Sequence, residues 1–590
     1  MPFYPKLKQG RTTRVMIDAF LGYNHNPKIA DGEFYETLNL SNRYYPLLAT
    51  RQKRGLLNRT FTNLQAVIAK DALYWVDNGT LYANGYATGL TGLQTEHETQ
   101  LVSMGAYICV FPDKKYINTQ DLTDYGSMGA DWSYTGSVTY TMCHSDGEYY
   151  TNVVKTDTEP EDPDNGEIWI DTVDGNVKEY SAYTQSWVII ETVYTRVDFL
   201  SMGQVSSAFK EYDGVEISGL YYDDLNGSKI LYAVGGDQNT SYDYVVLVGI
   251  QEEQYTQTGA TVRISRKVPD MDYVCEAQNR LWGCFYGNDG TQNLNEIYCC
   301  ALGDFRNWSQ YLGVSTDSWR GSRGSDGPFT GCINYLGTPT FFKENVIHPV
   351  SVSSVGAHQI DDIPARGVQQ GSHKSLAIVN ETLYYKARAG IMAYQGGMPV
   401  DVGAPLGEER YYSAVAGVFG QNYYISMKDS SNAWHFFKYD VRKGLWMHED
   451  NLHAEMFARV DDSLYVQYQN KLLDINGAQG TAEDDFDWEA VTGIQYYEQN
   501  VRGQGMVPVR YLSHYSIRLN MPLNSTMRID FEYDSSGIWT HYADIKLPTT
   551  GTATIPVRPR RCDHLRMRLR GRGEMKIYSI ARILEQGSDV

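Results

Sequence analysis

The sequence predicts an all-β protein: a β-propeller of about seven blades with an inserted small β-module and a C-terminal β-sandwich. Three observations predict this class. The 590 residues include 47 Tyr, 11 Trp and 54 Gly, a composition typical of strands joined by turns. Helical periodicity longer than two turns is hard to find. An apolar run, a short polar turn and an aromatic run recur along the chain.

The recurring unit is clearest in the last third of the chain. Copies begin at Ser375, Tyr412 and His453, in steps of 37 and 41 residues. That period suits a four-stranded propeller blade, which buries its faces only against neighbouring blades in a ring. Trp308 and Trp446 each follow a polar turn after an apolar strand, and we expect them to pack between blades. Looser copies of the unit span residues 64–85, 101–120, 271–287 and 329–350.

The composition changes along the chain and predicts five regions. A Pro- and Asp-rich link leads into short strands near residues 160–190 and marks an insertion. Towards the C-terminus polar and apolar residues alternate, as in sandwich strands with one solvated face. The regions are an N-terminal arm with the first propeller strands (1–60), propeller blades (61–124), the inserted β-rich module or modules (125–265), the remaining blades (266–480) and the sandwich (495–590).

Charge is unevenly distributed along the chain. The net charge is −20, but residues 1–60 and residues 501–590 each carry +6, so the 440 residues between them carry −32. An acidic body argues against a protein that grips nucleic-acid phosphates. It is compatible with a surface past which nucleic acid slides, because like charges repel, or with ordinary solvated charge. No apolar run of about 20 residues is present, which predicts no membrane span.

No catalytic constellation stands out, and the sequence predicts a protein that is not an enzyme and has no cofactor or metal site. A phosphate-binding loop, a zinc-protease motif and a nucleophile elbow are all missing. The eight cysteines form no C-x-x-C pair and are predicted to be buried, reduced thiols. Residues 533–539 partly resemble the Asp box of sialidase-type propellers but lack its leading Ser, so a hairpin turn is predicted there. Carboxylates are abundant, and no two of them are nominated as a glycosidase pair.

The densest basic feature lies near the C-terminus. Arg566, Arg568 and Arg570 alternate with apolar residues, so on a strand these arginines share one face. We interpret the face as a candidate docking surface for an acidic subunit or for phosphate; the alternative is a solvated sandwich face. The candidate residues are Arg558, Arg560, Arg561, Arg566, Arg568 and Arg570, and Arg572 continues the cluster.

Both ends of the chain carry a resemblance to a known family. The N-terminal phrases are DAFLGYN (18–24), DGEF (31–34), TLNL (37–40) and RQKRG (51–55), and the C-terminal phrases span residues 562–571 and 575–580. They resemble the propeller-type tail proteins of tailed bacteriophages known as tail hub, nozzle or packaged-DNA stabilisation proteins. The module at residues 160–190 is not a known part of that family.

The resemblance implies a structural protein of the virion tail, made in the host cytoplasm. Hub proteins form a ring of identical subunits, usually six, below the portal and its adaptor. They extend and close the DNA channel and provide a platform for tail fibres. The implied partners are therefore identical subunits, the portal-adaptor protein, tail fibres and passing phage DNA. We expect the acidic middle to line the channel and the basic N-terminal arm to face the adaptor.

Two other functions stay open. A tail protein that binds or cleaves a host glycan also suits a propeller rich in Trp and Tyr. A cellular propeller that scaffolds protein partners is the third interpretation, and it predicts no ring of identical subunits. An exposed platform of Trp169, Trp187 and Trp539 beside paired carboxylates favours the glycan function, whereas burial of these rings favours the hub.

Overall fold

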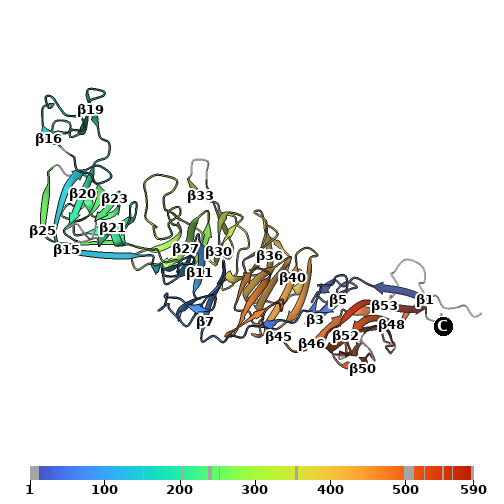
Figure 1. The fold of residues 1–590 in the computed structure, drawn as a ribbon. Helices are drawn as coiled ribbons and strands as arrows, with labels where there is room; N and C mark the ends of the chain where they lie inside the picture. Colours follow the sequence, from blue (N-terminus) through green and yellow to red (C-terminus); the bar gives the residue numbers. More distant parts are fainter. Residues whose placement is uncertain are drawn as a thin grey trace, which may run out of the picture. The chain divides into compact units, whose positions relative to one another are not determined.

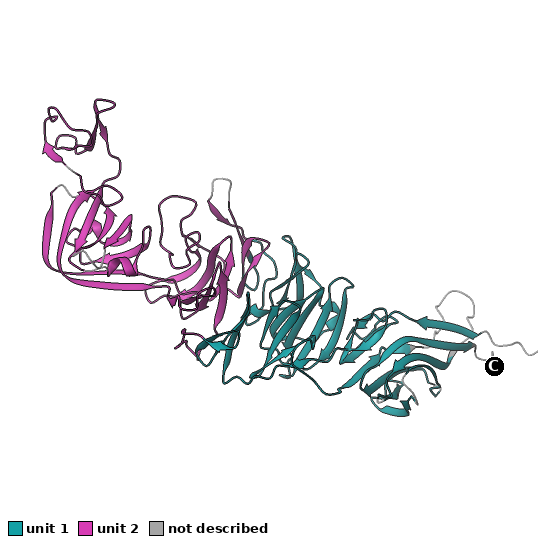
Figure 2. Ribbon diagram, in the orientation of Figure 1, with its two compact units in different colours: residues 1–87, 342–347, 363–590 teal, residues 88–341, 348–362 magenta. Residues whose placement is uncertain are grey.

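The computed structural model describes residues 12–586, except 151, 202–203, 237–241, 251–252, 353–356, 497–509, 524, 548–550 and 561. The described chain is nearly all β-structure, with one short helix, α1 (Val205–Ala208), and three 3-10 turns, η1 (Asp223–Leu225), η2 (His373–Ser375) and η3 (Ala404–Leu406) (Figure 1). It divides into two compact units, shown in Figure 2: unit 1 (1–87, 342–347 and 363–590) and unit 2 (88–341 and 348–362).

Unit 1 contains four blade-like sheets, three of them meanders of four consecutive strands. Their strands are β7 (Leu64–Ala69), β8 (Leu73–Asp77), β9 (Thr80–Ala83) and β10 (Tyr86–Ala87); β34 (Ala377–Val379), β35 (Thr382–Ala387), β36 (Gly390–Tyr394) and β37 (Val400–Asp401); β38 (Tyr412–Phe419), β39 (Asn422–Lys428), β40 (Trp434–Asp440) and β41 (Leu445–Asp450); and β42 (Met456–Val460), β43 (Ser463–Tyr468), β44 (Lys471–Asp474), β6 (Gly55–Leu56) and β45 (Thr481–Ala482).

These four sheets pack as propeller blades do. The first strands β34, β38, β42 and β7 lie next to one another in that order. Strand β35 is buried along its whole length, as expected for a central strand of a blade. Trp446 lies in the core between the β34–β37 and β38–β41 sheets, as predicted. Strand β6 comes from the N-terminal region and pairs with β44, where Leu56 faces Leu473.

Unit 2 contains three further meanders, except that residues 342–347 at one turn group with unit 1. Their first strands β11, β26 and β30 are neighbours, and Trp308 lies in the core beside β11–β14 and β26–β29, as predicted. The strands are β11 (Gln100–Met104), β12 (Tyr107–Phe111), β13 (Lys115–Asn118) and β14 (Tyr125–Ser127); β26 (Tyr273–Ala277), β27 (Arg280–Asn288), β28 (Asn293–Cys299) and β29 (Trp319–Ser322); and β30 (Gly331–Tyr335), β31 (Thr338–Phe342), β32 (Ile347–Val352) and β33 (His358–Ile360).

The insertion in unit 2 is a seven-stranded sheet in the order β22-β21-β25-β15-β20-β24-β23, with its own apolar core. A small four-stranded sheet, β16–β19, is inserted within it. The structure places the first strand of the insertion at residue 130 rather than 125, because β14 pairs with β13 of the preceding meander. The strands are β15 (Ala130–Cys143), β16 (Val153–Thr156), β17 (Ile168–Asp171), β18 (Val177–Ser181), β19 (Ser186–Ile189), β20 (Tyr194–Phe199), β21 (Gly214–Ser218), β22 (Gly227–Ile230), β23 (Ala233–Gly236), β24 (Asp243–Val248) and β25 (Tyr255–Arg266).

A two-sheet sandwich completes unit 1, and it draws strands from both ends of the chain. One sheet holds β1 (Thr12–Ile17), β4 (Leu40–Ser41), β5 (Leu48–Thr50), β48 (Arg510–Met521), β51 (Gly551–Val557) and β53 (Lys576–Gln586). The other holds β2 (Gly22–Tyr23), β3 (Glu33–Leu38), β46 (Asp487–Thr492), β47 (Gln495–Tyr496), β49 (Thr526–Tyr533), β50 (Trp539–Lys546) and β52 (His564–Arg572).

The N-terminal strands differ from the prediction for residues 1–60. Strand β1 pairs with β53, and β3 pairs with β46, so β1–β5 belong to the sandwich and only β6 joins a blade-like sheet. Residues 1–11 of the predicted arm lie outside the described residues. The alternation of exposed and half-buried residues in β1 fits a sandwich strand, but its partner lies more than 550 residues away, as in the pair Thr12 and Glu585.

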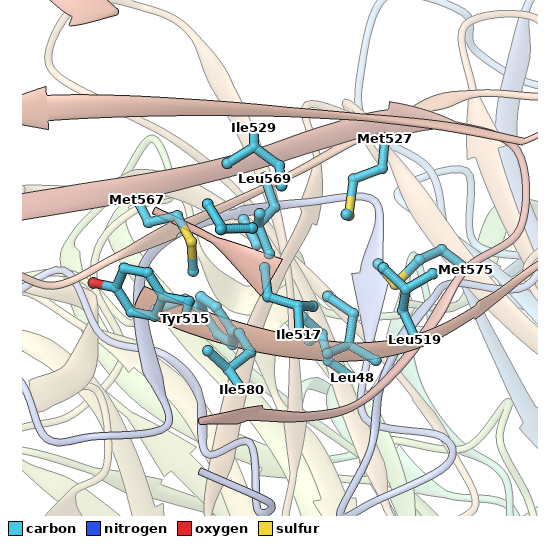
Figure 3. Packing of buried hydrophobic residues seen from close by; sticks show 14 of the residues in the cluster. Leu48, Tyr515, Ile517, Leu519, Met527, Ile529, Met567, Leu569, Met575 and Ile580 are labelled. Atoms are coloured by element: carbon cyan, nitrogen blue, oxygen red, sulfur yellow. The ribbon is translucent and has the colours of Figure 1, made fainter. Parts of the chain in front are cut away.

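The sandwich core lies between the two sheets (Figure 3). Ile517 and Leu519 of β48 meet Ile529 of β49 and Met567 and Leu569 of β52, and all five side chains are fully buried. Each contributes roughly 2 kcal/mol through removal of apolar surface from water. Every second residue of β52 points into this core, so the residues between them point to the outer face of the sheet.

Candidate functional site

The predicted arginine face is present on the outer side of β52. Its arginines are matched by carboxylates on the neighbouring strand β49. Arg566 Nε lies 2.8 Å from Glu532 Oε2, Arg568 Nη2 lies 2.9 Å from Asp530 Oδ2, and Arg570 Nη2 lies 3.1 Å from the same oxygen. Asp530 is only 1% exposed. Burial alone would raise its pKa, but hydrogen bonds and charges from the arginines hold it below the usual range.

The other candidate arginines lie elsewhere. Arg558 and Arg560 are exposed in the segment after β51, and the Arg560 guanidinium stacks 4.2 Å from the centre of the Tyr533 ring. Arg561 lies outside the described residues. Sequence reasoning missed the acidic partners, although the alternation in MRIDFEY already places Asp530 and Glu532 on one face. Docking by this face stays a prediction.

A chain of histidines and carboxylates connects the sandwich to the β38–β41 sheet within unit 1. Glu36 of β3 lies 3.3 Å from His25 Nδ1 and 3.1 Å from His448 Nδ1. His448 Nε2 lies 3.4 Å from His435 Nδ1, and His435 Nε2 lies 2.9 Å from Asp429 Oδ2. Sequence reasoning could not find this network, because Glu36 and His448 are 412 residues apart.

The network shifts the proton affinity of three of its groups. The hydrogen bond to Glu36 is the main cause that raises the pKa of His25. Burial alone would raise the pKa of Glu36, but its hydrogen bonds with His25 and His448 lower it to about 2. Burial alone would also raise the pKa of Asp429, but its hydrogen bonds, of which the one from His435 has the largest effect, lower it to about 2. Both carboxylates are therefore charged over the whole physiological range.

A cavity of about 810 Å³ opens at one end of the β34–β37 sheet and lies entirely among residues of unit 1. The turn between β35 and β36 contributes Arg388, and the connection between β37 and β38 contributes Glu408 and Tyr411. The turn between β31 and β32 contributes Glu344. These segments are the turns between the second and third strands of two sheets and the connection from one sheet to the next. The cavity is therefore lined mainly by loops that the sheets hold in place.

Side chains of both charges line this cavity. The basic residues are Arg366, Lys386, Arg388 and Arg410, and the acidic residues are Glu344, Asp401, Glu408 and Glu409. The buried Lys386 donates hydrogen bonds to Gln369 Oε1, at 3.0 Å, and to the Ala387 carbonyl. Burial lowers the pKa of Lys386 to about 8, against a smaller opposing effect of the Asp401 charge.

Trp169, Trp187 and Trp539, whose exposure was expected to separate the glycan function from the hub, mainly pack against neighbouring side chains. Trp169 is buried, and its Nε1 donates to the Thr156 carbonyl at 3.1 Å. Trp187 is half-buried and meets Trp169 edge-on. Trp539 is half-buried below the Arg568 guanidinium, 4.4 Å from it. These rings do not form the open platform that was to favour the glycan function.

Five of the eight cysteines are buried, as predicted, whereas Cys275, Cys332 and Cys562 are half-buried. The partial Asp box at residues 533–539 forms the predicted hairpin between β49 and β50. In the described part of the chain, no group of three or more His, Cys, Asp or Glu side chains is arranged to hold a metal ion. No helix among the described residues is long and apolar enough to span a membrane.

The comparisons with known proteins give only distant likenesses. No protein-family model and no curated protein matches the chain. An exo-β-1,3-galactanase from Phanerochaete chrysosporium is 8% identical, with a TM-score of 0.22 over 52% of this chain and 94% of the galactanase. A family 43 arabinoxylan arabinofuranohydrolase from Bacillus subtilis is 9% identical, with a TM-score of 0.17 over 52% of this chain and 94% of its own. A Trypanosoma rangeli sialidase is 7% identical, with a TM-score of 0.22 over 98% of this chain and 97% of its own.

These neighbours are enzymes that act on glycans, and they contradict the prediction that the chain is not an enzyme. That prediction is withdrawn. TM-scores near 0.2 carry no argument for a shared site, however, so a function has to be argued from the residues of this chain.

Proposed function

We propose that the chain is a component of a bacteriophage tail, of the hub or nozzle type. One observation carries the proposal. The phrases that resemble tail hub proteins are far apart in the chain, yet all but the one at residues 51–55, which leads into β6, contribute to one sandwich: β3 pairs with β46, and β46 pairs with β52, while β1, β5 and β48 pair with β53. The resemblance also covers the propeller pattern loosely, and its most specific phrases, at the two ends of the chain, come together mainly in a single module.

The arrangement of the blades supports this proposal. Among the described residues, seven blade-like sheets occur, four in unit 1 and three in unit 2. We propose that they close into one seven-bladed ring, because the outer faces of an open array would stay unburied. The N-terminal strand β6 in the last blade is the kind of pairing that holds a ring shut. Identical subunits then assemble around the DNA channel, in contact with the adaptor and the fibres.

The proposal is tested by the mass and shape of the assembled protein. The chain is mixed with purified portal and adaptor and examined by mass photometry and electron cryomicroscopy. We expect a closed homo-oligomeric ring that seats on the adaptor. A trimeric spike, or a chain that stays monomeric in the presence of the adaptor, contradicts the hub proposal.

A second candidate function, binding or cleavage of a host glycan, is favoured by the cavity of unit 1. Its volume of about 810 Å³ accommodates several sugar rings, and its lining offers carboxylates, guanidinium groups and the exposed Tyr412 ring. Sugars are recognised by such hydrogen-bonding groups together with aromatic faces. Retention on host-surface polysaccharide, and its loss when the cavity is altered, tests this function. Retention that survives every cavity substitution contradicts it.

A further inference from the structure

We propose that the cavity of unit 1 selects acidic saccharides, sugars that carry a carboxylate. The inference rests on the glycan-binding function proposed above and names the ligand class of that site. It is carried by the partners of the charged side chains that line the cavity.

Three guanidinium groups in the cavity are available to a ligand. Within the part of the chain that the structure describes, the side chains of Arg366, Arg388 and Arg410 take part in no ion pair or hydrogen bond. In the sandwich, by contrast, Arg566 and Arg568 are each held by a carboxylate of the neighbouring strand. A guanidinium group binds a carboxylate through two parallel hydrogen bonds. This bidentate contact is stronger and more specific in direction than the contact of a lysine ammonium group.

The cavity acids are oriented by the backbone. Asp401 Oδ1 accepts a hydrogen bond from the Gly403 amide at 2.8 Å, and a Cβ on Gly390 would come within 2.5 Å of the Asp401 carboxylate. Glu344 Oε1 accepts a hydrogen bond from the Gln370 amide at 3.1 Å. A carboxylate accepts several hydrogen bonds, so the remaining lone pairs can accept sugar hydroxyls.

The charge balance of the lining distinguishes a saccharide from a polyphosphate. Four basic and four acidic side chains surround the cavity, so its formal charge is zero. A polyphosphate would meet the four carboxylates at short range and be repelled. A sugar with one carboxylate and several hydroxyls uses both sets: the arginines bind the carboxylate, and the acids accept the hydroxyls. Tyr412, 42% exposed, adds an aromatic face for a sugar ring.

The test uses matched ligands. The full chain is titrated calorimetrically with oligosaccharides from polygalacturonate, alginate and polysialic acid, and with the same oligosaccharides after reduction of their carboxyl groups to alcohols. We expect at least one acidic ligand to bind roughly tenfold or more tightly than its reduced form, the effect of one or two charge-assisted hydrogen bonds.

Variants locate the effect. Arg388→Ala and Arg410→Ala are each expected to lower the affinity for the acidic ligand about tenfold and to leave the affinity for the reduced ligand unchanged. Arg442→Ala, an exposed arginine of the same unit outside the cavity, is the matched control and should bind as the parent does. Equal binding of acidic and reduced ligands overturns the selectivity but leaves glycan binding intact. Binding of neither, with the protein folded, overturns both.

Discussion

Units 1 and 2 are both built from blade-like sheets with an added β-domain, yet they differ sharply in charge. Unit 2 contains 38 Asp and Glu against 14 Lys and Arg, whereas unit 1 contains 33 against 37. The acidity of the chain therefore belongs to unit 2. Unit 1 contains the sandwich, the histidine network and the cavity, where charges of opposite sign meet. Similar sheets thus carry two kinds of surface: one with matched charge, suited to specific contacts, and one with excess negative charge, suited to repelling polyanions.

The largest effect is expected where matched charge is buried. Asp530→Ala removes the carboxylate that Arg528, Arg568 and Arg570 share. We expect the free energy of unfolding of unit 1 to fall by about 3 kcal/mol, because the arginines are left without their buried partner. Denaturant unfolding followed by hydrogen exchange of sandwich peptides measures it.

The control for this variant is Asp563→Ala, whose exposed carboxylate lies 3.0 Å from His564 Nδ1. It should cost less than about 0.5 kcal/mol. Equal losses in the two variants would show that burial of the matched pair does not set the stability of unit 1.

Salt sharpens the comparison between the units. Excess negative charge destabilises a compact unit through self-repulsion, which added salt screens. We expect the melting temperature of unit 2 to rise by roughly 3 °C between about 0.02 M and 0.5 M NaCl, and that of unit 1 to rise less or fall. Hydrogen exchange at each salt concentration assigns the transitions. An equal rise of the melting temperature in both units would contradict the proposed electrostatic difference between them.

The histidine network gives unit 1 a pH dependence. The pKa of Glu36 is about 2 in the folded protein against 4.5 ordinarily, so its contribution is present above about pH 4.5 and lost as the pH falls towards 2. The pKa of His25 is raised above 6.5, so its contribution is present below that pH and lost as the pH rises through the raised value. This part of unit 1 is therefore most stabilised between about pH 4.5 and 6.5.

Glu36→Gln removes the low-pKa carboxylate itself and also the charged partner of His25. The loss of stability below pH 4.5 and the loss above pH 6.5 should therefore both become smaller. His97→Gln, in an exposed segment of unit 2, should change neither side. The profile is measured by urea unfolding of unit 1 across pH 3 to 8. A profile unchanged in Glu36→Gln would contradict the role of the network.

The smallest effect is expected at the exposed arginines. Arg558→Ala should change the free energy of unfolding by less than about 0.5 kcal/mol, and Arg570→Ala, 37% exposed in its ion pair, by at most about 1 kcal/mol. Surface plasmon resonance against the adaptor then tests docking separately. Weaker docking at full stability supports the docking face, and unchanged docking argues against it.

The sequence predicted the kinds of elements better than their partners. Turn residues and aromatic runs recur locally, so the strands, the blade-like sheets and the packing of Trp308 and Trp446 follow from neighbouring residues. The place of β1 in the sandwich does not, because Thr12 pairs with a residue more than 550 positions away. The regular alternation around Arg566–Arg570 indicated a shared face, and the same rule applied to β49 would have indicated its carboxylates.

The cavity and the histidine network could not be predicted in the same way. Their residues come from turns and connections without a motif, such as Arg388 and Glu408, and from strands hundreds of positions apart, such as Glu36 and His448. Only the packing of the sheets brings them together. No catalytic motif therefore marks the part of unit 1 where these charged groups gather.

The most direct test of this account is an electron cryomicroscopy reconstruction of the chain assembled on its portal and adaptor. The account predicts a ring in which acidic unit 2 surfaces line the DNA opening and the sandwich of unit 1 meets the neighbouring tail proteins. A ring whose opening is lined by the basic strands of the sandwich, or a particle with no opening, would contradict it.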